Sequence, residues 1–337
     1  MFYFSKIVHI KWENTRKSGK ILIYKDFKGG VFFMKTYIGV DLGGTNVRVA
    51  KVDEEGNILQ IVKEPTEVAQ GTEHVINKII SMIEKIDGYA DCEGIGMGVP
   101  GPVNTIEGKM VLATNLPGFE GFPIAKTISD HFQMPTFVDN DVNVAGMGEA
   151  MLGAGKGLPV VYYVTISTGI GGALVVNQRV VAGKNGHAGE VANIIIDRNR
   201  EKVNYLNVGA VENEASGTAI TRKGKAIFGD DKIRHAGDVF DLAREGDEKA
   251  LKLCDEVAYD LAVMFSAIAH VVDPYVFVVG GGVMKGKDLF FDKMEAYYRT
   301  MIHKGMQTVE FKEAQLEEPG IVGAAMLPRS YVDKENI

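Results

Sequence analysis

The sequence predicts a mixed α/β fold with two lobes. Three expected strands, at 36–40, 46–53 and 58–63, follow one another directly, which indicates an antiparallel meander. Helices and strands alternate after them, as in layered α/β proteins. A second strand pair, at 160–167 and 172–176, then starts around another glycine-rich turn. Because 337 residues can bury two sizeable cores, we expect a second α/β lobe there.

The elements follow from apolar runs and their periodicity. Tyr37 to Val40 form a short apolar run, and Val47 to Val52 alternate like a returning strand. The first lobe should continue with helix 72–86, strand 94–99, helix 122–131, strand 135–139 and helix 142–151. The second should contain helices at 215–228 and 248–271, the buried strand 275–279 and a closing helix at 321–332. We therefore expect a small lobe from 34–150 with 320–337, and a large lobe from 151–319.

Residues 1–33 differ in character from the rest. They mix aromatic residues, lysines and Trp12 without a cleavage site or a sustained apolar core, which argues against a secretory signal. Met34 stands directly before the first strand, and a purine-rich run of the AAAGGAGGU type could encode Lys28 to Val31. Our hypothesis is that 1–33 is an extension from a mis-called translation start. A DNA-binding arm, the alternative, would need a helix-turn-helix, for which length and helical periodicity are lacking.

Composition narrows the class of protein. The chain is 46% hydrophobic and 24% charged, which is ordinary for a globular protein, and its net charge of -7 argues against a nucleic-acid surface. Cys92 and Cys254 lie far apart without C-x-x-C spacing, as expected in a reducing cytoplasm. No apolar stretch approaches the roughly 20 residues of a membrane span. We expect a cytoplasmic protein that binds neither nucleic acid nor membrane.

The first glycine turn, residues 41–46, follows the first strand. Gly43 and Gly44 would let the backbone take positive φ and turn its N–H groups toward an anion, with Thr45 and Asn46 as further donors. Asp41 would repel a phosphate unless a cation lay between, so it suggests Mg²⁺ held directly or through water. The alternative is an ordinary hairpin turn.

Three more glycine turns are candidates for the same site: the second at 166–172, the third at 278–283 and the fourth at 319–325. Ser167 and Thr168 offer hydroxyls suited to terminal phosphates, and Gly281 and Gly282 would let an adenine or ribose lie flat on the backbone. Each is alternatively a strand-to-helix junction, the fourth above all. Neither a P-loop nor a Rossmann dinucleotide motif is present.

A polar cluster ends the strand 135–139. Asn140 and Asp141 would lie at the carboxyl end of that strand, where α/β sheets place ligands. Asp141 alternatively only caps the next helix, a role worth about 1 kcal/mol. With Asp139 and Asn143 nearby, the cluster is denser than one cap requires.

Together these motifs resemble the sugar-kinase branch of the actin, heat-shock and hexokinase superfamily, and within it the ROK family, most closely its bacterial glucokinases. The resemblance covers Met34 to about residue 330. Its motifs are 41–46, 98–103, 115–119, 139–143, 166–172, 188–190, and Glu212 ahead of 215–220. It implies the two-lobed actin-like, hexokinase-type ATPase fold (ribonuclease H-like), with nucleotide and sugar in the interlobe cleft.

The resemblance also implies roles for individual residues. Asp141 would be the catalytic base, for which an ordinary pKa of about 4 is adequate. The implied sugar-binding residues are Asn115, Asn140, Asp141, Glu190 and Glu212. The implied residues for ATP and Mg²⁺ are Asp41, Gly43, Gly44, Thr45, Asn46, Thr168, Gly169, Gly281 and Gly282, with Mg²⁺ near Asp41. Relatives are often dimers or tetramers, so we expect a homo-oligomer.

One departure concerns a structural zinc site. Family members usually hold zinc with one His and three Cys in the loop after Ala-Gly-Glu. Here the His position is Asn193, and the Cys positions are Val203, Tyr205 and Ala210. We therefore predict no zinc, with apolar packing or hydrogen bonds ordering this loop. His187 and His235 are isolated and make poor substitute ligands.

The predicted activity is ATP-dependent phosphorylation of a hexose, with glucose giving glucose 6-phosphate. Fructose, mannose, allose, N-acetylglucosamine and N-acetylmannosamine are alternative substrates, because the altered loop helps to shape the sugar pocket. A sugar-sensing ROK regulator would carry a DNA-binding domain ahead of this body. An actin-like or chaperone ATPase would not need Asn140 and Asp141 together with Glu190 and Glu212.

Overall fold

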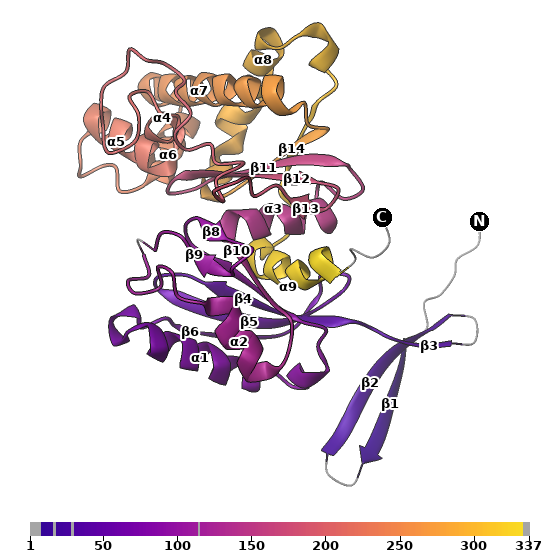
Figure 1. Ribbon diagram of the computed structural model, residues 1–337. Helices are drawn as coiled ribbons and strands as arrows, with labels where there is room; N and C mark the ends of the chain where they lie inside the picture. The colour runs from indigo at the N-terminus through magenta and orange to yellow at the C-terminus, as the bar shows by residue number, and fades with distance from the viewer. Residues whose placement is uncertain (1–7, 16–17, 28–29, 114, 333–337) are drawn as a thin grey trace.

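A computed structural model of the chain describes residues 8–15, 18–27, 30–113 and 115–332. It has two lobes, each built on a five-stranded sheet, with two helices between them (Figure 1). The predicted mixed α/β class with two lobes is confirmed. Within the described residues, no helix is both long and apolar enough to cross a membrane.

The sheet of the small lobe has the strand order β10-β7-β4-β5-β6. Its strands are β4 (Thr36–Leu42), β5 (Asn46–Asp53), β6 (Ile58–Pro65), β7 (Ile95–Val99) and β10 (Thr136–Asn140). The first three form the predicted antiparallel meander, whereas β7 and β10 run parallel to β4. Helices α1 (Thr72–Glu84) and α2 (Ile124–Phe132) cover one face of this sheet with apolar side chains, as expected for amphipathic helices.

The sheet of the large lobe has the order β13-β12-β11-β14-β15. Its strands are β11 (Val160–Ile166), β12 (Ile170–Val176), β13 (Arg179–Val180), β14 (Val276–Gly280) and β15 (Glu310–Glu313). Five helices cover its outer face: α4 (Glu212–Ala215), α5 (Gly217–Phe228), α6 (Ala236–Arg244), α7 (Glu248–Val272) and α8 (Lys287–Met301). The short elements are η1 (Val68–Gln70), η2 (Tyr89–Asp91), η3 (Gly282–Gly286), η4 (Lys304–Met306), β8 (Val103–Asn104) and β9 (Lys109–Met110).

Helices α3 (Asp141–Met151) and α9 (Pro319–Val332) lie between the sheets. α9 packs on the small-lobe sheet, while α3 packs on α9 and on the large-lobe sheet. Their approach is close: a Cβ on Gly323 would overlap the Val144 carbonyl, and one on Gly96 would overlap the Ala324 carbonyl. The prediction of a fourth glycine turn is therefore wrong, because residues 319–325 lie inside α9 and Gly323 allows the close approach of α3.

The N-terminal segment forms a separate antiparallel sheet of β1 (Val8–Thr15), β2 (Ser18–Phe27) and β3 (Gly30–Phe33). It projects away from the two lobes (Figure 1). The described part of this segment is strand rather than helix. Residues 28–29, which the purine-rich run would encode, lie outside the described residues, and the hypothesis of a mis-called translation start stays a prediction.

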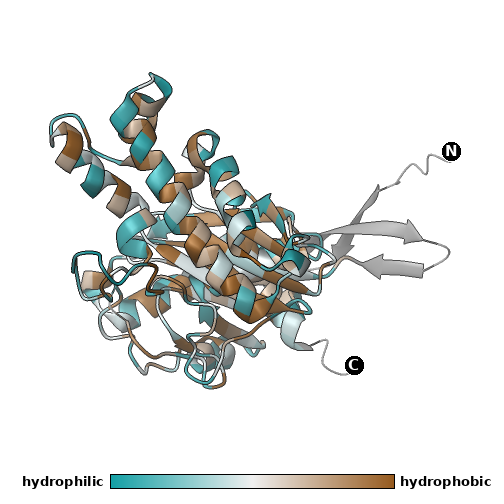
Figure 2. Ribbon diagram, turned by 90° about the horizontal axis from the view of Figure 1, so that it is seen from above, coloured by the Kyte–Doolittle hydropathy of each residue, from teal (hydrophilic) through white to brown (hydrophobic). Residues whose placement is uncertain are grey.

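The apolar residues concentrate in the sheets and in the helix faces turned toward them (Figure 2). The two outer helical layers and the α3–α9 layer each bury a cluster of aliphatic and aromatic side chains. Layers packed in this way hold the strand ends rigidly, and the polar residues described next are attached to those ends.

Candidate active site

Asp141 is the first residue of α3, and Asn140 ends β10 directly before it. The Asn140 side-chain oxygen accepts hydrogen bonds from the Val142 and Asn143 N–H groups at 2.9 and 3.2 Å, so Asn140 is the N-cap. The alternative in which Asp141 only caps the helix is therefore wrong. The Asn140 amide also donates to the Gly101 carbonyl at 3.0 Å, which fixes its orientation.

The buried Asp139 stabilises the junction between β10 and α3. Its buried carboxylate accepts the Asn140 N–H at 2.7 Å and the Asn143 side-chain amide at 2.8 Å. Burial raises the pKa of Asp139 to about 6, against the effect of these hydrogen bonds. Asp139 and Asn143 therefore stabilise the turn between β10 and α3, whereas Asp141 lies half-buried at its surface.

The electrostatic surroundings of Asp141 are acidic. Burial raises its pKa to about 6, and the negative charges of Asp41 and Glu190 add to the shift. Asp141 therefore differs from the ordinary aspartate that the sequence analysis considered adequate, because the sequence does not show how deeply this carboxylate is buried or which acids lie near it. Asp41 of the small lobe and Glu190 of the large lobe are thus both near enough to Asp141 to affect its pKa.

The first glycine turn joins β4 to β5, and Asp41 pairs with Arg48 across that hairpin. The hairpin alternative is thus correct as a description of the backbone. Neither Gly43 nor Gly44 has φ in the left-handed region, contrary to expectation. Their lack of a side chain serves close approach instead, because a Cβ on Gly44 would lie 3.0 Å from the Asn115 carbonyl oxygen. Asn115 therefore lies against the turn. The side chains of Thr45 and Asn46 are exposed.

Asp41 has a cationic neighbour that we did not predict. The Arg48 Nε donates to Asp41 Oδ2 at 3.0 Å, and the same guanidinium pairs with Glu318. Burial alone would lower the pKa of Arg48, but Asp41 and Glu318 together raise it. Arg48 thus fixes the direction of the Asp41 carboxylate.

The surroundings of Asp41 fit a magnesium ion bound through water. Both Arg48 contacts fall on Oδ2, which leaves Oδ1 for a water ligand. In the described part of the chain, no three His, Cys, Asp or Glu side chains converge into a metal cage. Such an ion would therefore be held mainly by nucleotide phosphates and water, as Mg²⁺ commonly is.

The second and third glycine turns meet beside a cavity of about 710 Å³. Ser167, Thr168 and Gly282 line it, and Gly281, with φ of 95°, packs so closely on the Ile166 carbonyl that a Cβ would overlap it. The described residues that line the cavity all belong to the large lobe. The cavity thus joins two of the predicted nucleotide turns, while the first glycine turn lies on the other lobe.

The cationic side chains that line this cavity were not predicted from the sequence. The lining includes the cationic Arg222, Lys225, Arg234 and Lys285, and the imidazole of His235 lies among them. The α5 members could have been found, because Thr218, Thr221, Arg222 and Lys225 recur at helical spacing on one face. Arg234 and His235 lie in the connection to α6 and show no such pattern.

Glu212 lies against the second glycine turn, and Glu190 lies near Asp141. The Glu212 Oε2 accepts the Ile170 N–H at 2.9 Å and leaves no room for a Cβ on Gly169.

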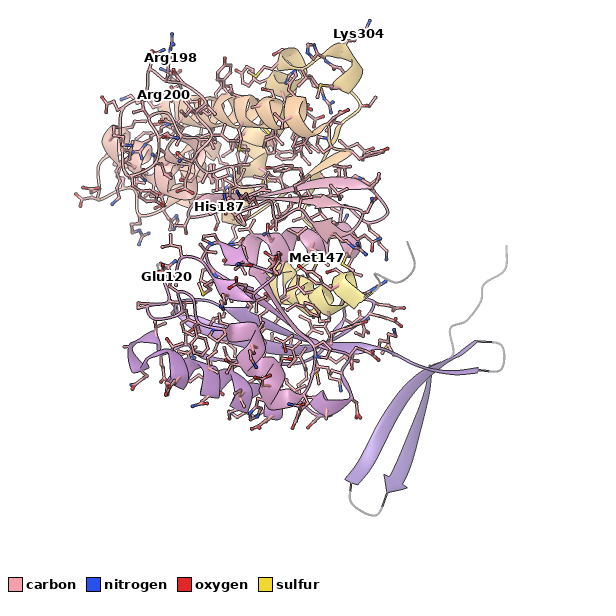
Figure 3. All side chains as sticks on the ribbon, in the orientation of Figure 1. Glu120, Met147, His187, Arg198, Arg200 and Lys304 are labelled. Atoms are coloured by element: carbon pink, nitrogen blue, oxygen red, sulfur yellow. The ribbon has the colours of Figure 1, made fainter. Side chains whose placement is uncertain are left out.

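Burial raises the pKa of Glu190; the charge of His187 opposes this shift, and the charge of Glu212 adds to it. Tyr162, which the sequence did not single out, donates to the Gly189 carbonyl at 2.9 Å and so positions Glu190. His187 lies where the upper lobe faces the lower one (Figure 3).

The loop after Glu190 is held by hydrogen bonds. The Asn193 side-chain oxygen accepts the Asn207 N–H at 2.7 Å, and the Ile196 N–H donates to the Gly209 carbonyl at 2.9 Å. Val203 and Tyr205 are exposed, whereas Ala210 is buried. The absence of zinc stays a prediction, but the hydrogen bonds that we expected to order this loop are present.

Comparison with known proteins identifies the family. The ROK family profile matches residues 37–330. The chain belongs to the ROK family. A glucokinase of Halalkalibacterium halodurans is 30% identical to this ROK protein over 311 residues, which cover 86% of this chain and 94% of that protein.

Two solved ROK structures are similar to this ROK protein. The ROK hexokinase from Thermus thermophilus has a TM-score of 0.80 at 29% identity, covering 89% of this chain and 99% of that one. A ROK glucokinase from Streptomyces griseus, solved with glucose and AMPPNP, has a TM-score of 0.70 at 28% identity, covering 87% and 99%. The two-lobed hexokinase-type fold is therefore confirmed.

Proposed function

We propose that this ROK protein is an ATP-dependent hexose kinase whose preferred substrate is glucose, with glucose 6-phosphate as the product. The observation that carries the proposal is the position of Asp141. It lies at the start of α3, close enough to Asp41 of the small lobe and Glu190 of the large lobe for both to raise its pKa. A sugar hydroxyl held there would face the nucleotide turns of both lobes.

The proposed reaction depends on positioning and charge neutralisation. The phosphates of ATP would lie between the first and second glycine turns, with Thr168 offering a hydroxyl and a backbone N–H. The cationic lining of the 710 Å³ cavity would neutralise further negative charge. A magnesium ion bound with ATP near Asp41 would supply charge neutralisation at the phosphates.

Asp141 would act as the general base. Its carboxylate would accept the proton of the attacking sugar hydroxyl as the bond to the γ-phosphoryl group forms. With a pKa of about 6, Asp141 is ionised at neutral pH and closer in basicity to the hydroxyl than an ordinary aspartate. Its orientation depends on Asn140, whose cap fixes the first turn of α3.

Glu190 and Glu212 would orient the sugar by accepting hydrogen bonds from its hydroxyls. Asn115, beside Gly44, and the second N–H of the Asn140 amide would add contacts from the small lobe. Closure of the lobes around the sugar would exclude water and limit ATP hydrolysis. The support for glucose in particular is the similarity to glucokinases at about 30% identity.

A coupled assay of ADP release over a sugar panel tests this proposal. We expect ADP release that depends on added sugar, with the highest kcat/KM for glucose among glucose, fructose, mannose, allose and the two N-acetylhexosamines. A higher kcat/KM for another sugar would reject the preference for glucose and keep the hexose kinase. ADP release that no sugar stimulates would reject the kinase.

A further inference from the structure

A long connection without helices or strands separates Glu190 from Glu212. We name residues 191–211 the anchor loop; among the described residues, its one ladder contact is an isolated bridge between Ile195 and Ala210. Both ends close on each other, because the Glu212 N–H donates to the Ala192 carbonyl at 3.1 Å and the Val211 N–H to the Ile194 carbonyl at 2.9 Å. The placement of both glutamates therefore depends on what fixes this loop.

Arg200 of the anchor loop reaches three carboxylates. Its Nε lies 3.0 Å from Asp197, its Nη1 3.1 Å from Glu214 of α4, and its Nη2 2.9 Å from Asp260 of α7. The planar guanidinium can meet all three at once, which a lysine ammonium cannot do with the same geometry. One side chain thus connects the loop to two helices of the large lobe.

Two of these carboxylates need a cation. The side chains of Glu214 and Asp260 are only 5% and 3% exposed, and an unpaired charge at such depth is strongly unfavourable. Lys223 pairs with Glu214 at 2.8 Å but stays 3.8 Å from Asp260. Asp260 therefore depends mainly on Arg200, which holds the anchor loop against the body of the lobe.

We propose that Arg200 is a positioning residue: by pairing with the buried Glu214 and Asp260 it fixes the anchor loop and so holds Glu190 and Glu212 in place for the sugar. This inference rests on the proposed function for the role of the two glutamates. The attachment of the anchor loop by Arg200 rests only on its contacts with the three carboxylates. Arg200 acts through the loop, since its three partners are protein carboxylates.

The chain offers a matched control two residues away. Arg198 lies in the same loop and is exposed, and Figure 3 shows it beside Arg200 on the upper lobe. Arg200→Met and Arg198→Met remove the same charge from the same loop. They differ in whether a buried carboxylate loses its partner.

The test combines hydrogen exchange with sugar kinetics on the full-length protein. In Arg200→Met we expect the Ile196 and Val211 amides to exchange at least about tenfold faster, because the loop opens more often. We also expect the KM for glucose to rise at least about tenfold, while kcat at saturating glucose and the KM for ATP change little. Arg198→Met should match the wild type, and Arg200→Lys should fall between them.

The outcomes separate the claims. If exchange and sugar KM of a folded Arg200→Met protein equal those of the wild type, the proposal is wrong. If Arg200→Met does not fold, the Arg200→Met/Asp260→Asn protein removes the unpaired buried charge, and it must show the same fast exchange and raised KM or the proposal fails. A wild type that phosphorylates no hexose would contradict the proposed function. The hydrogen-exchange result would still test whether Arg200 fixes the anchor loop.

Discussion

Asp141 owes its chemical character to its place at the end of β10. The carboxyl end of the strand and the cap by Asn140 fix its backbone, while burial and the nearby acids raise its pKa to about 6. The sequence indicated the residue, because an Asn-Asp pair between strand and helix is informative. It did not indicate the pKa or the Arg48 partner of Asp41, since both depend on side chains that meet only in the folded protein.

The pH dependence of activity follows from this pKa. Asp141 accepts a proton only when ionised, so kcat/KM for glucose should fall about tenfold per pH unit below about pH 6 and level off above pH 7. Glu190→Gln should move the midpoint to lower pH, because it removes a negative charge that raises the pKa. Initial rates from pH 4.5 to 8 check this, and a wild-type midpoint near pH 4 would contradict it.

Asp139 leads to a prediction about stability. Its pKa is higher in the folded protein, about 6, than the roughly 3.9 of an unfolded aspartate, so the folded state binds the proton more tightly. The stability from this group is fully present below about pH 4 and is lost as the pH rises through 6. Asp139→Asn should therefore exceed the wild type in unfolding free energy by about 1 to 3 kcal/mol at pH 7 and by little near pH 4.

Urea unfolding at several pH values measures this difference. The exposed Asp231→Asn serves as the control and should show no such dependence. An Asp139→Asn protein that is less stable than the wild type at pH 7 would show that the hydrogen bonds of the carboxylate outweigh its burial.

At the scale of elements, α3 and α9 decide how closely the lobes pack. The glycines at their crossing leave no space for a side chain. Gly323→Ala would press a methyl group into the Val144 carbonyl and so force the two helices apart, which should cost about 1 to 3 kcal/mol. Thermal or urea unfolding measures the loss.

Gly305→Ala is the matched control for this substitution. An added Cβ at Gly305 meets no atom within 4 Å, so its effect should stay within about 0.5 kcal/mol. Equal effects of the two substitutions would mean that the crossing adapts without strain.

Most elements of the two lobes could be predicted from apolar runs and helical periodicity, including the meander β4 to β6 and the long helix α7. α6, α8 and β15 were missed. The buried Phe290, Met294 and Tyr298 of α8 do recur at helical spacing, so this helix could have been predicted, whereas β15 is a four-residue strand with a polar sequence. The fourth glycine turn was mistaken for a turn because a glycine that admits a neighbouring helix looks the same in sequence as one that bends the chain.

At the scale of the whole molecule, the three N-terminal strands pair with one another and project from the lobes (Figure 1). We therefore expect a chain that begins at Met34 to keep the kcat and the melting temperature of the full chain within error. Side-by-side kinetics and calorimetry check this. A large loss of either would show that the projecting sheet supports the body.

The candidate site takes residues from both lobes. Sequence motifs indicated the candidate acids and the candidate nucleotide turns. Asp41 and Asp141 lie at or directly after strand ends, whereas Glu190 lies in a loop and Glu212 begins α4. The cavity beside α5 and the Arg200 contacts could not be predicted, since they depend on how helices far apart in the chain pack together.

The most direct test of the account compares the wild type with Asp141→Asn. The measurement is formation of glucose 6-phosphate from glucose and ATP, together with calorimetric binding of glucose to both proteins. We predict that the wild type forms the product, and that Asp141→Asn binds glucose but has a kcat lower by at least about 10²-fold. A folded Asp141→Asn protein that turns over at the wild-type rate would contradict the account.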